Sequence, residues 1–195
     1  MGNNGSLTAG VAFSTNTPNN QGCSLSFNGS GSVTFAAPPT AATTNVTITA
    51  WVYLSSVSLR GAFVHNGSLV GGGDGFALGV GGTNFDTYGN HLILLGDAVA
   101  WRDSGANIGI GWHHVAITKD ASTWQFYLDG SIVGAKASLT PLVPTGGAAL
   151  GMDTATYPRN FTGNLDDVRI YNRTLLSKDI HQMYVQGLSQ HVATR

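Results

Sequence analysis

The 195-residue sequence contains no glutamate, only three lysines and a single cysteine, Cys23. One cysteine excludes an internal disulfide, a paired-thiol redox site and a cysteine-based zinc site, and we expect Cys23 to be a small buried apolar side chain. Charged residues make up 10% of the chain, whereas about a quarter is usual for a globular protein. The nine basic residues form no cluster, so we expect no nucleic-acid partner.

The chain also lacks targeting and membrane signals. Its first residues have neither the basic start nor the apolar run of a signal peptide, and no stretch approaches the roughly 18 apolar residues of a membrane-spanning helix. We therefore expect no membrane insertion. An extracellular or virion-surface location is expected from the functions considered below. Two origins remain open: a module of a larger secreted protein, or a complete small protein delivered by assembly. A surface so poor in charge has weak self-repulsion, which favours association.

Short β-type runs dominate what is present. They are separated by clusters of glycine, asparagine, serine and proline, which is the spacing of an all-β sandwich. Asp129-Gly130 lies between two runs and predicts a two-residue hairpin turn, since both central residues need a positive φ. The runs cover residues 24–27, 32–35, 46–54, 62–65, 76–80, 92–95, 112–119, 123–128, 131–135, 148–152 and 163–171.

The remaining segments complete the expected domain organisation. Residues 1–22 have too few large apolar side chains to bury a face, and we expect an extended N-terminal arm. Residues 23–187 form one sandwich domain, and residues 188–195 form a C-terminal tail. The only expected helix begins at Ser177, places Ile180 on its buried face and ends at Gly187.

Five phrases, at residues 25–29, 46–52, 111–118, 126–130 and 161–173, occur in a fixed order. Together they resemble the laminin-G-like, concanavalin-A-like lectin and glucanase superfamily, especially its bacterial and viral branch. The resemblance implies an all-β fold: a two-sheet antiparallel jelly-roll β-sandwich with one short C-terminal helix. It also implies a glycan or cell-surface polysaccharide as ligand.

Catalysis is not expected. Glycosidases of the wider superfamily use a pair of carboxylates across the scissile bond. Here the only adjacent acids are Asp166 and Asp167, and neighbours in a strand point to opposite faces. We expect Asp166 to face the core, and Asp167 to form an ion pair with Arg169 on the other face. Trp51 and Trp112 lie in apolar strands and are expected in the core.

Two adjacent histidines, His113 and His114, invite a metal-site interpretation. Because they alternate along a strand, they cannot chelate one ion together. We expect one to pack at the edge of the core and the other to form a hydrogen bond at the surface.

Calcium is the one cofactor that the resemblance suggests, since sandwiches of this superfamily carry calcium held by loop oxygens. The resemblance places its ligands near Asn28 and Asp166, although Asn28 stands where the family commonly has an aspartate. Asp153 is a further candidate ligand, and other loop acids are Asp74, Asp86 and Asp103.

Sugar rings stack on exposed aromatic side chains flanked by amides and acids, which loops on a rigid sandwich supply. Three segments have this composition, and in each the aromatic side chain could instead anchor its own loop. The candidate glycan-binding residues are Phe85, Asp86, Tyr88, Asn90, Trp101, Arg102, Asp103, Tyr157 and Arg159.

Two functions therefore stand side by side, because a fold does not settle function. The first is a non-catalytic, surface-exposed module for glycan binding or adhesion. The second is a structural decoration, cement or fibre protein of a virion, which would associate with itself or with other surface proteins. A polysaccharide-degrading enzyme ranks third.

Overall fold

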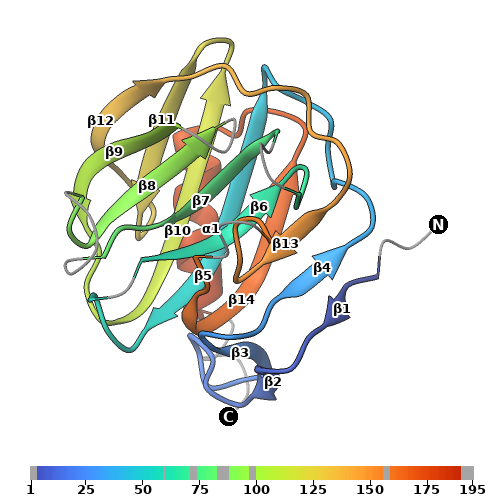
Figure 1. Ribbon diagram of the computed structural model, residues 1–195. Coiled ribbons are helices and arrows are strands. Elements are labelled where there is room, and N and C mark those ends of the chain that lie inside the picture. Colours follow the sequence, from blue (N-terminus) through green and yellow to red (C-terminus); the bar gives the residue numbers. More distant parts are fainter. Residues whose placement is uncertain are drawn as a thin grey trace.

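The computed structural model describes residues 4–58, 60–70, 74–82, 88–96, 100–155 and 159–189. Two antiparallel sheets of seven strands each face one another, and one helix covers the outer side of the second sheet (Figure 1). The predicted all-β sandwich with one C-terminal helix is confirmed. The described part of the chain has no helix with the length and hydrophobicity needed to span a bilayer.

The first sheet, sheet A, holds the strands in the front layer of Figure 1. Its outermost strands, β1 and β9, were not expected from the sequence. In spatial order it consists of β1 (Ser6–Leu7), β4 (Val33–Phe35), β13 (Ala148–Leu150), β6 (Gly61–Asn66), β7 (Phe76–Val80), β8 (His91–Gly96) and β9 (Ala100–Asn107).

The second sheet, sheet B, lies behind it and carries helix α1 (Ser177–Ser189) on its far side (Figure 1). The long strands β5, β10 and β14 form its centre. In spatial order it consists of β12 (Ser131–Ser138), β11 (Thr123–Leu128), β10 (Gly111–Asp120), β5 (Val46–Leu54), β14 (Thr162–Tyr171), β3 (Ser24–Asn28) and β2 (Val11–Ser14).

The main core fills the space between the sheets, because every second residue of each strand points inward. Its largest members are aromatic, and the rest are mainly Val, Ile and Leu. They include Phe27, Ile48, Val52, Phe63, Phe76, Leu78, Leu94, Val115, Trp124 and Phe126.

A second, smaller cluster holds α1 against sheet B. Ile180 of the helix packs with Tyr127 and Ala116 of the sheet. Tyr184 stacks on Trp51, with ring centroids 5.7 Å apart. Trp51 is therefore buried as predicted, although between sheet and helix rather than between the two sheets. The helix continues two residues beyond the predicted end at Gly187.

The hairpin at Asp129-Gly130 is confirmed, since Leu128 pairs with Ser131 and both turn residues have a positive φ, 48° and 74°. Trp112 is not in the core as expected, because it is half-buried on the outer side of sheet B, where it packs on Tyr53. Three other expectations are wrong. Residues 1–22 are not a free arm, because β1 pairs with β4 and β2 pairs with β3. Cys23 is exposed rather than buried.

The third correction concerns the end of sheet B. Pairing between β14 and β5 is regular up to Asp166, opposite Trp51, and resumes only at Arg169, opposite Thr49. Asp167 has a φ of 45°, so one extra residue is inserted as a β-bulge. Asp166 consequently lies on the outer face with Trp51, not in the core, and strand alternation does not separate it from Asp167.

On the opposite side of the sandwich, β9 of sheet A and β12 of sheet B come together. Gly134 in β12 has a φ of 63°, and a Cβ built there would lie 2.0 Å from the backbone oxygen of Ser104. Gly105 in β9 also has a positive φ, 71°, but an added Cβ would meet nothing within 4 Å. Substitutions at these two glycines therefore distinguish the cost of backbone strain from the cost of a steric clash.

Gly134→Ala is expected to lower the free energy of unfolding by about 2 kcal/mol, half from the left-handed backbone and half from the clash with Ser104. Gly105→Ala should lower it by only about 1 kcal/mol, because it adds the strain without the clash. Urea unfolding of both variants measures the difference. Equal losses would show that the two strands are not in close contact.

Candidate functional site

The outer face of sheet A brings together polar and aromatic residues from separate parts of the sequence. The strand register places His65, Ala77, Leu95 and Trp101 in one row across β6, β7, β8 and β9. Their neighbours Val64, Leu78 and Leu94 belong to the core. Because side chains alternate, the row that contains His65 and Trp101 faces outward.

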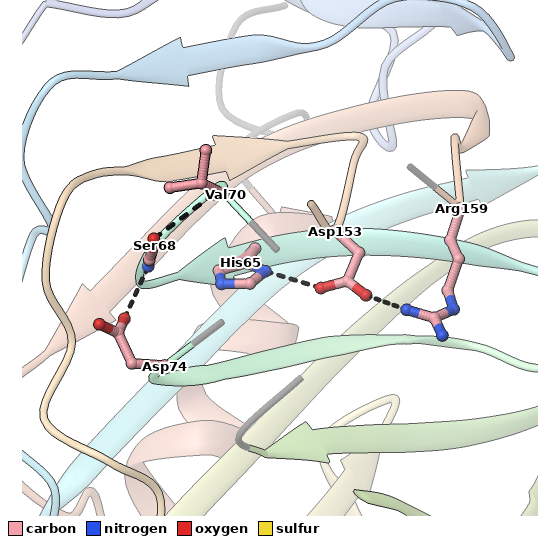
Figure 2. Close-up of polar contacts among 6 residues, drawn as sticks. All are labelled: His65, Ser68, Val70, Asp74, Asp153 and Arg159. Atoms are coloured by element: carbon pink, nitrogen blue, oxygen red, sulfur yellow. Dashed lines mark hydrogen bonds and ion pairs between the residues drawn. The ribbon is translucent and has the colours of Figure 1, made fainter. Parts of the chain in front are cut away.

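A buried ion network lies at the centre of this face (Figure 2). His65 Nδ1 lies 2.7 Å from Asp153 Oδ1 and donates to it, and Arg159 Nη1 donates to Asp153 Oδ2. The side chains of His65 and Asp153 are 1% and 0% exposed. The segment after β13 is therefore fixed to the middle of sheet A by charge-assisted hydrogen bonds.

Asp74 anchors a second loop near the same histidine (Figure 2). Its Oδ1 accepts hydrogen bonds from the backbone nitrogens of Ser68, at 2.6 Å, and Thr145, at 3.0 Å. Burial raises the pKa of Asp74, but the hydrogen bonds from Thr145 and Ser68 and the nearby His65 outweigh it and lower the pKa. Asp74 thus ties two covering segments together as a carboxylate.

Arg159 extends from the buried network to the strand at the edge of the sheet. Its guanidinium carbon lies 5.2 Å from the ring centroid of Trp101, a cation–π contact. Two residues further along β9, Asp103 lies on the same face, and both of its oxygens are 3.0 Å from His91 Nδ1. We call Trp101, Asp103, His91 and Arg159 the sheet A site.

The predicted glycan residues divide into three groups. Trp101, Asp103 and Arg159 converge on the sheet A site, although Trp101 stands on a strand rather than on a loop. Arg102 alternates with Trp101 and points to the opposite side, where it donates to the Trp101 carbonyl. Phe85, Asp86 and Tyr157 lie outside the described residues.

Tyr88 and Asn90 are half-buried in the turn that leads into β8. Asn90 Nδ2 donates to the carbonyl of Ile108, and the Asn90 carbonyl accepts from the Ile108 nitrogen. The Asn90 amide therefore holds its own loop, which is the alternative that the sequence left open for this segment.

Two members of this face were missed in the sequence. His65 is paired with Asp153, 88 positions away, and no local pattern indicates such a contact. His91 was overlooked because β9 was taken for a loop. The alternation of Trp101 and Asp103 with Arg102 and Ser104 is the signal that predicts this strand.

The candidate calcium ligands do not meet. Asn28 pairs with Thr162 at one end of β14, whereas Asp166 lies four residues further along that strand. Both oxygens of Asp153 are held by His65 and Arg159. Among the described residues, no three His, Cys or Asp side chains are grouped to hold a metal. Calcium binding stays a prediction to which this geometry adds no support.

The histidine pair on β10 is arranged as expected. His114 is buried beneath α1, where its ring lies edge-on to Trp51 with centroids 5.4 Å apart. Its pKa is lowered to about 4, mainly by burial. The His113 side chain is half-buried, and its Nδ1 lies 2.8 Å from Asp129 Oδ2. The two side chains thus have different partners and do not form one site.

Two facing antiparallel sheets, with an aromatic and polar site on an outer face, define a lectin-like β-sandwich. Residues 27–181 match the family model of the concanavalin A-like lectin/glucanases superfamily, and the chain belongs to this superfamily. No curated protein matches the chain.

Solved structures with the same fold include three from proteins that act on or bind carbohydrate or carry a binding domain. Domain 4 of AbnA, an extracellular arabinanase from Geobacillus stearothermophilus solved with arabinotriose, has a TM-score of 0.72 and 16% identity, covering 92% of this chain and 87% of that one. The binding domain of botulinum neurotoxin DC, solved with SialylT, has a TM-score of 0.68 and 16% identity, covering 96% of this chain and 47% of that one. Trypanosoma rangeli sialidase, solved with the inhibitor DANA, has a TM-score of 0.62 and 17% identity, covering 88% of this chain and 28% of that one. At these identities the likeness is one of fold.

Proposed function

We propose that the protein is a non-catalytic module that binds glycan chains through the sheet A site. The observation that carries the proposal is the convergence of Trp101, Asp103 and Arg159 on one outer face of the sandwich. An indole supplies apolar surface for a sugar ring, while a carboxylate and a guanidinium supply acceptors and donors for its hydroxyl groups. The complexes of similar folds with arabinotriose and SialylT support this ligand class.

The arrangement of the acids supports binding rather than catalysis. Among the described residues of the sheet A site and its buried network, the carboxylates are Asp103 and Asp153. Asp103 is paired with His91, and Asp153 is enclosed by His65 and Arg159. A glycosidase needs one carboxyl group to deliver a proton and a second to attack or to activate water. Because Asp153 is enclosed, Asp103 has no second accessible carboxylate to act with among the described residues of this site.

Trp101→Ala should weaken glycan binding by about ten-fold or more, because a stacked aromatic side chain contributes at least about 1.5 kcal/mol. Retention on an array of arabinan and sialylated oligosaccharides measures this. The matched control is Trp112→Ala, which removes a half-buried tryptophan that packs on Tyr53 on the outer side of sheet B. Equal retention of the Trp101→Ala variant and the wild-type protein would refute a role for the sheet A site.

A structural subunit of a virion or fibre is the second proposal. It is supported by large apolar side chains that stand exposed despite the small amount of charge, among them Phe13, Val70, Ile110 and Leu142. Such side chains are suited to contacts between subunits. Light scattering separates the two proposals, since a monodisperse monomer that binds glycan does not fit a purely structural role.

A further inference from the structure

A cavity of about 310 Å³ lies on the other side of the molecule from the sheet A site. Its walls are the segment of residues 18–23 and helix α1, and the bulge of β14 forms its floor. Asn19 Nδ2 donates to the carbonyl of Gly187 at 3.2 Å, which joins the two walls. We call this cavity the helix-side pocket.

Trp51 brings an unpartnered donor to the helix-side pocket. The side chain is 4% exposed, and its Nε1 donates to no acceptor among the described residues. Gly187 lines the same pocket, and a Cβ built on it would lie 2.5 Å from Trp51 Nε1. The indole N–H therefore borders the pocket where the helix lacks a side chain. A donor that opens into a cavity in this way is available to a hydroxyl group of a ligand or to water.

Asp166 brings an acceptor to the same pocket, because the bulge turns it outward. Its Oδ1 accepts from the backbone nitrogen of Asp167 at 2.8 Å, while its Oδ2 has no donor among the described residues. The carboxylate of Asp167 is already engaged, 2.7 Å from Arg169 Nε. One carboxylate oxygen and one indole N–H thus remain available in one cavity.

We propose that the helix-side pocket binds a single sugar residue, as a second carbohydrate site separate from the sheet A site. A hydroxyl group is both donor and acceptor, so one polyhydroxyl ring satisfies Asp166 and the Trp51 N–H together. An ammonium group would pair with Asp166 but leave the indole N–H without an acceptor. An anion would accept from the indole but be repelled by Asp166. The proposal does not depend on the sheet A site.

Cys23 allows occupancy of the helix-side pocket by a ligand to be measured. It is the only cysteine of the chain, it is exposed, and it lines the helix-side pocket. We would follow its alkylation by iodoacetamide in the presence of arabinose, galactose or glucose, with ethylammonium as the cationic probe. At least one sugar should slow the alkylation saturably, because an occupied pocket shields the thiol.

Two variants test the named contacts. Trp51→Phe keeps a ring between Tyr184 and His114 but removes the N–H, and Asp166→Asn removes the charge of the acceptor. Each should raise the sugar concentration for half-protection about ten-fold, the worth of one hydrogen bond to a buried partner. Trp101→Ala should leave the protection unchanged, so failure of the sheet A site and failure of this pocket give different results.

Three outcomes would overturn the proposal. They are alkylation that no sugar slows, protection that persists unchanged in both variants, and protection by ethylammonium but by no sugar. Asp166→Asn also keeps the test decisive if Trp51→Phe loosens the helix, because it leaves the ring contacts of Trp51 with Tyr184 and His114 intact.

Discussion

Asp153→Asn is expected to lower the free energy of unfolding by about 3 kcal/mol, because it removes a fully buried negative charge that pairs with the largely buried Arg159 guanidinium. Asp153 is fully buried, and its two oxygens connect His65 on β6 to Arg159. Arg159 in turn makes the cation–π contact with Trp101. The variant should therefore also lose affinity at the sheet A site, and urea unfolding at neutral pH measures the stability part.

The chain offers a matched control in Asp167→Asn. Asp167 forms the same type of ion pair with Arg169, but the two side chains are 48% and 49% exposed. Water screens such a pair, so its loss should cost less than about 1 kcal/mol. Asparagine also tolerates the positive φ of this position. If both variants lose the same stability, the network around Asp153 does not hold the fold together.

Acidification should destabilise the protein through His114. Burial lowers its folded-state pKa to about 4; Arg169 acts in the same direction, while Asp129 and Asp167 raise it. In the unfolded chain the pKa of histidine is about 6.5, so the unfolded state binds the extra proton between these two values. Stability therefore falls as the pH falls through this window, by about 3 kcal/mol at pH 4.

His114→Phe isolates this contribution, since it keeps a ring against Trp51 and Tyr184 but cannot be protonated. Urea unfolding midpoints should fall between neutral pH and about pH 5 in the unchanged protein, and stay nearly level in the variant. The comparison is confined to this range because the pKa of Asp74 is lowered and its titration lies in more acidic solution, while the raised pKa of Asp166 affects both proteins alike. Parallel pH profiles would show that another group is responsible.

Much of the sandwich was predictable because its central strands carry a strong local pattern. The apolar run of β5 is buried almost throughout, and so is the run from His114 to Lys119 in β10. Strands at the edges were not predictable in this way. Ser6–Leu7 and Val11–Ser14 bury little apolar surface, and their structure depends on pairing with β4 and β3. Pairing between distant segments leaves no local signal.

The sheet A site was predictable in part. An aromatic residue near an acid and an arginine is visible in the sequence, and so Trp101, Asp103 and Arg159 were identified. What joins them is not visible, because His65 and Asp153 meet across 88 positions. The bulge at Asp166 was missed for a similar reason: alternation predicts the opposite face, and only the register with β5 reveals the extra residue.

The N-terminal strands bear on how readily the open sheet edges can pair with another chain. Exposed strand edges are templates for aggregation, and proteins commonly protect them with charge, which this chain has in small supply. Here β1 and β2 leave only two and four residues at the open edges, although Phe13 in β2 is 75% exposed. At the other side β9 and β12 lie against each other. The short edge strands and the contact between β9 and β12 thus limit edge-to-edge pairing without charge repulsion. Resistance to aggregation should therefore be largely insensitive to salt.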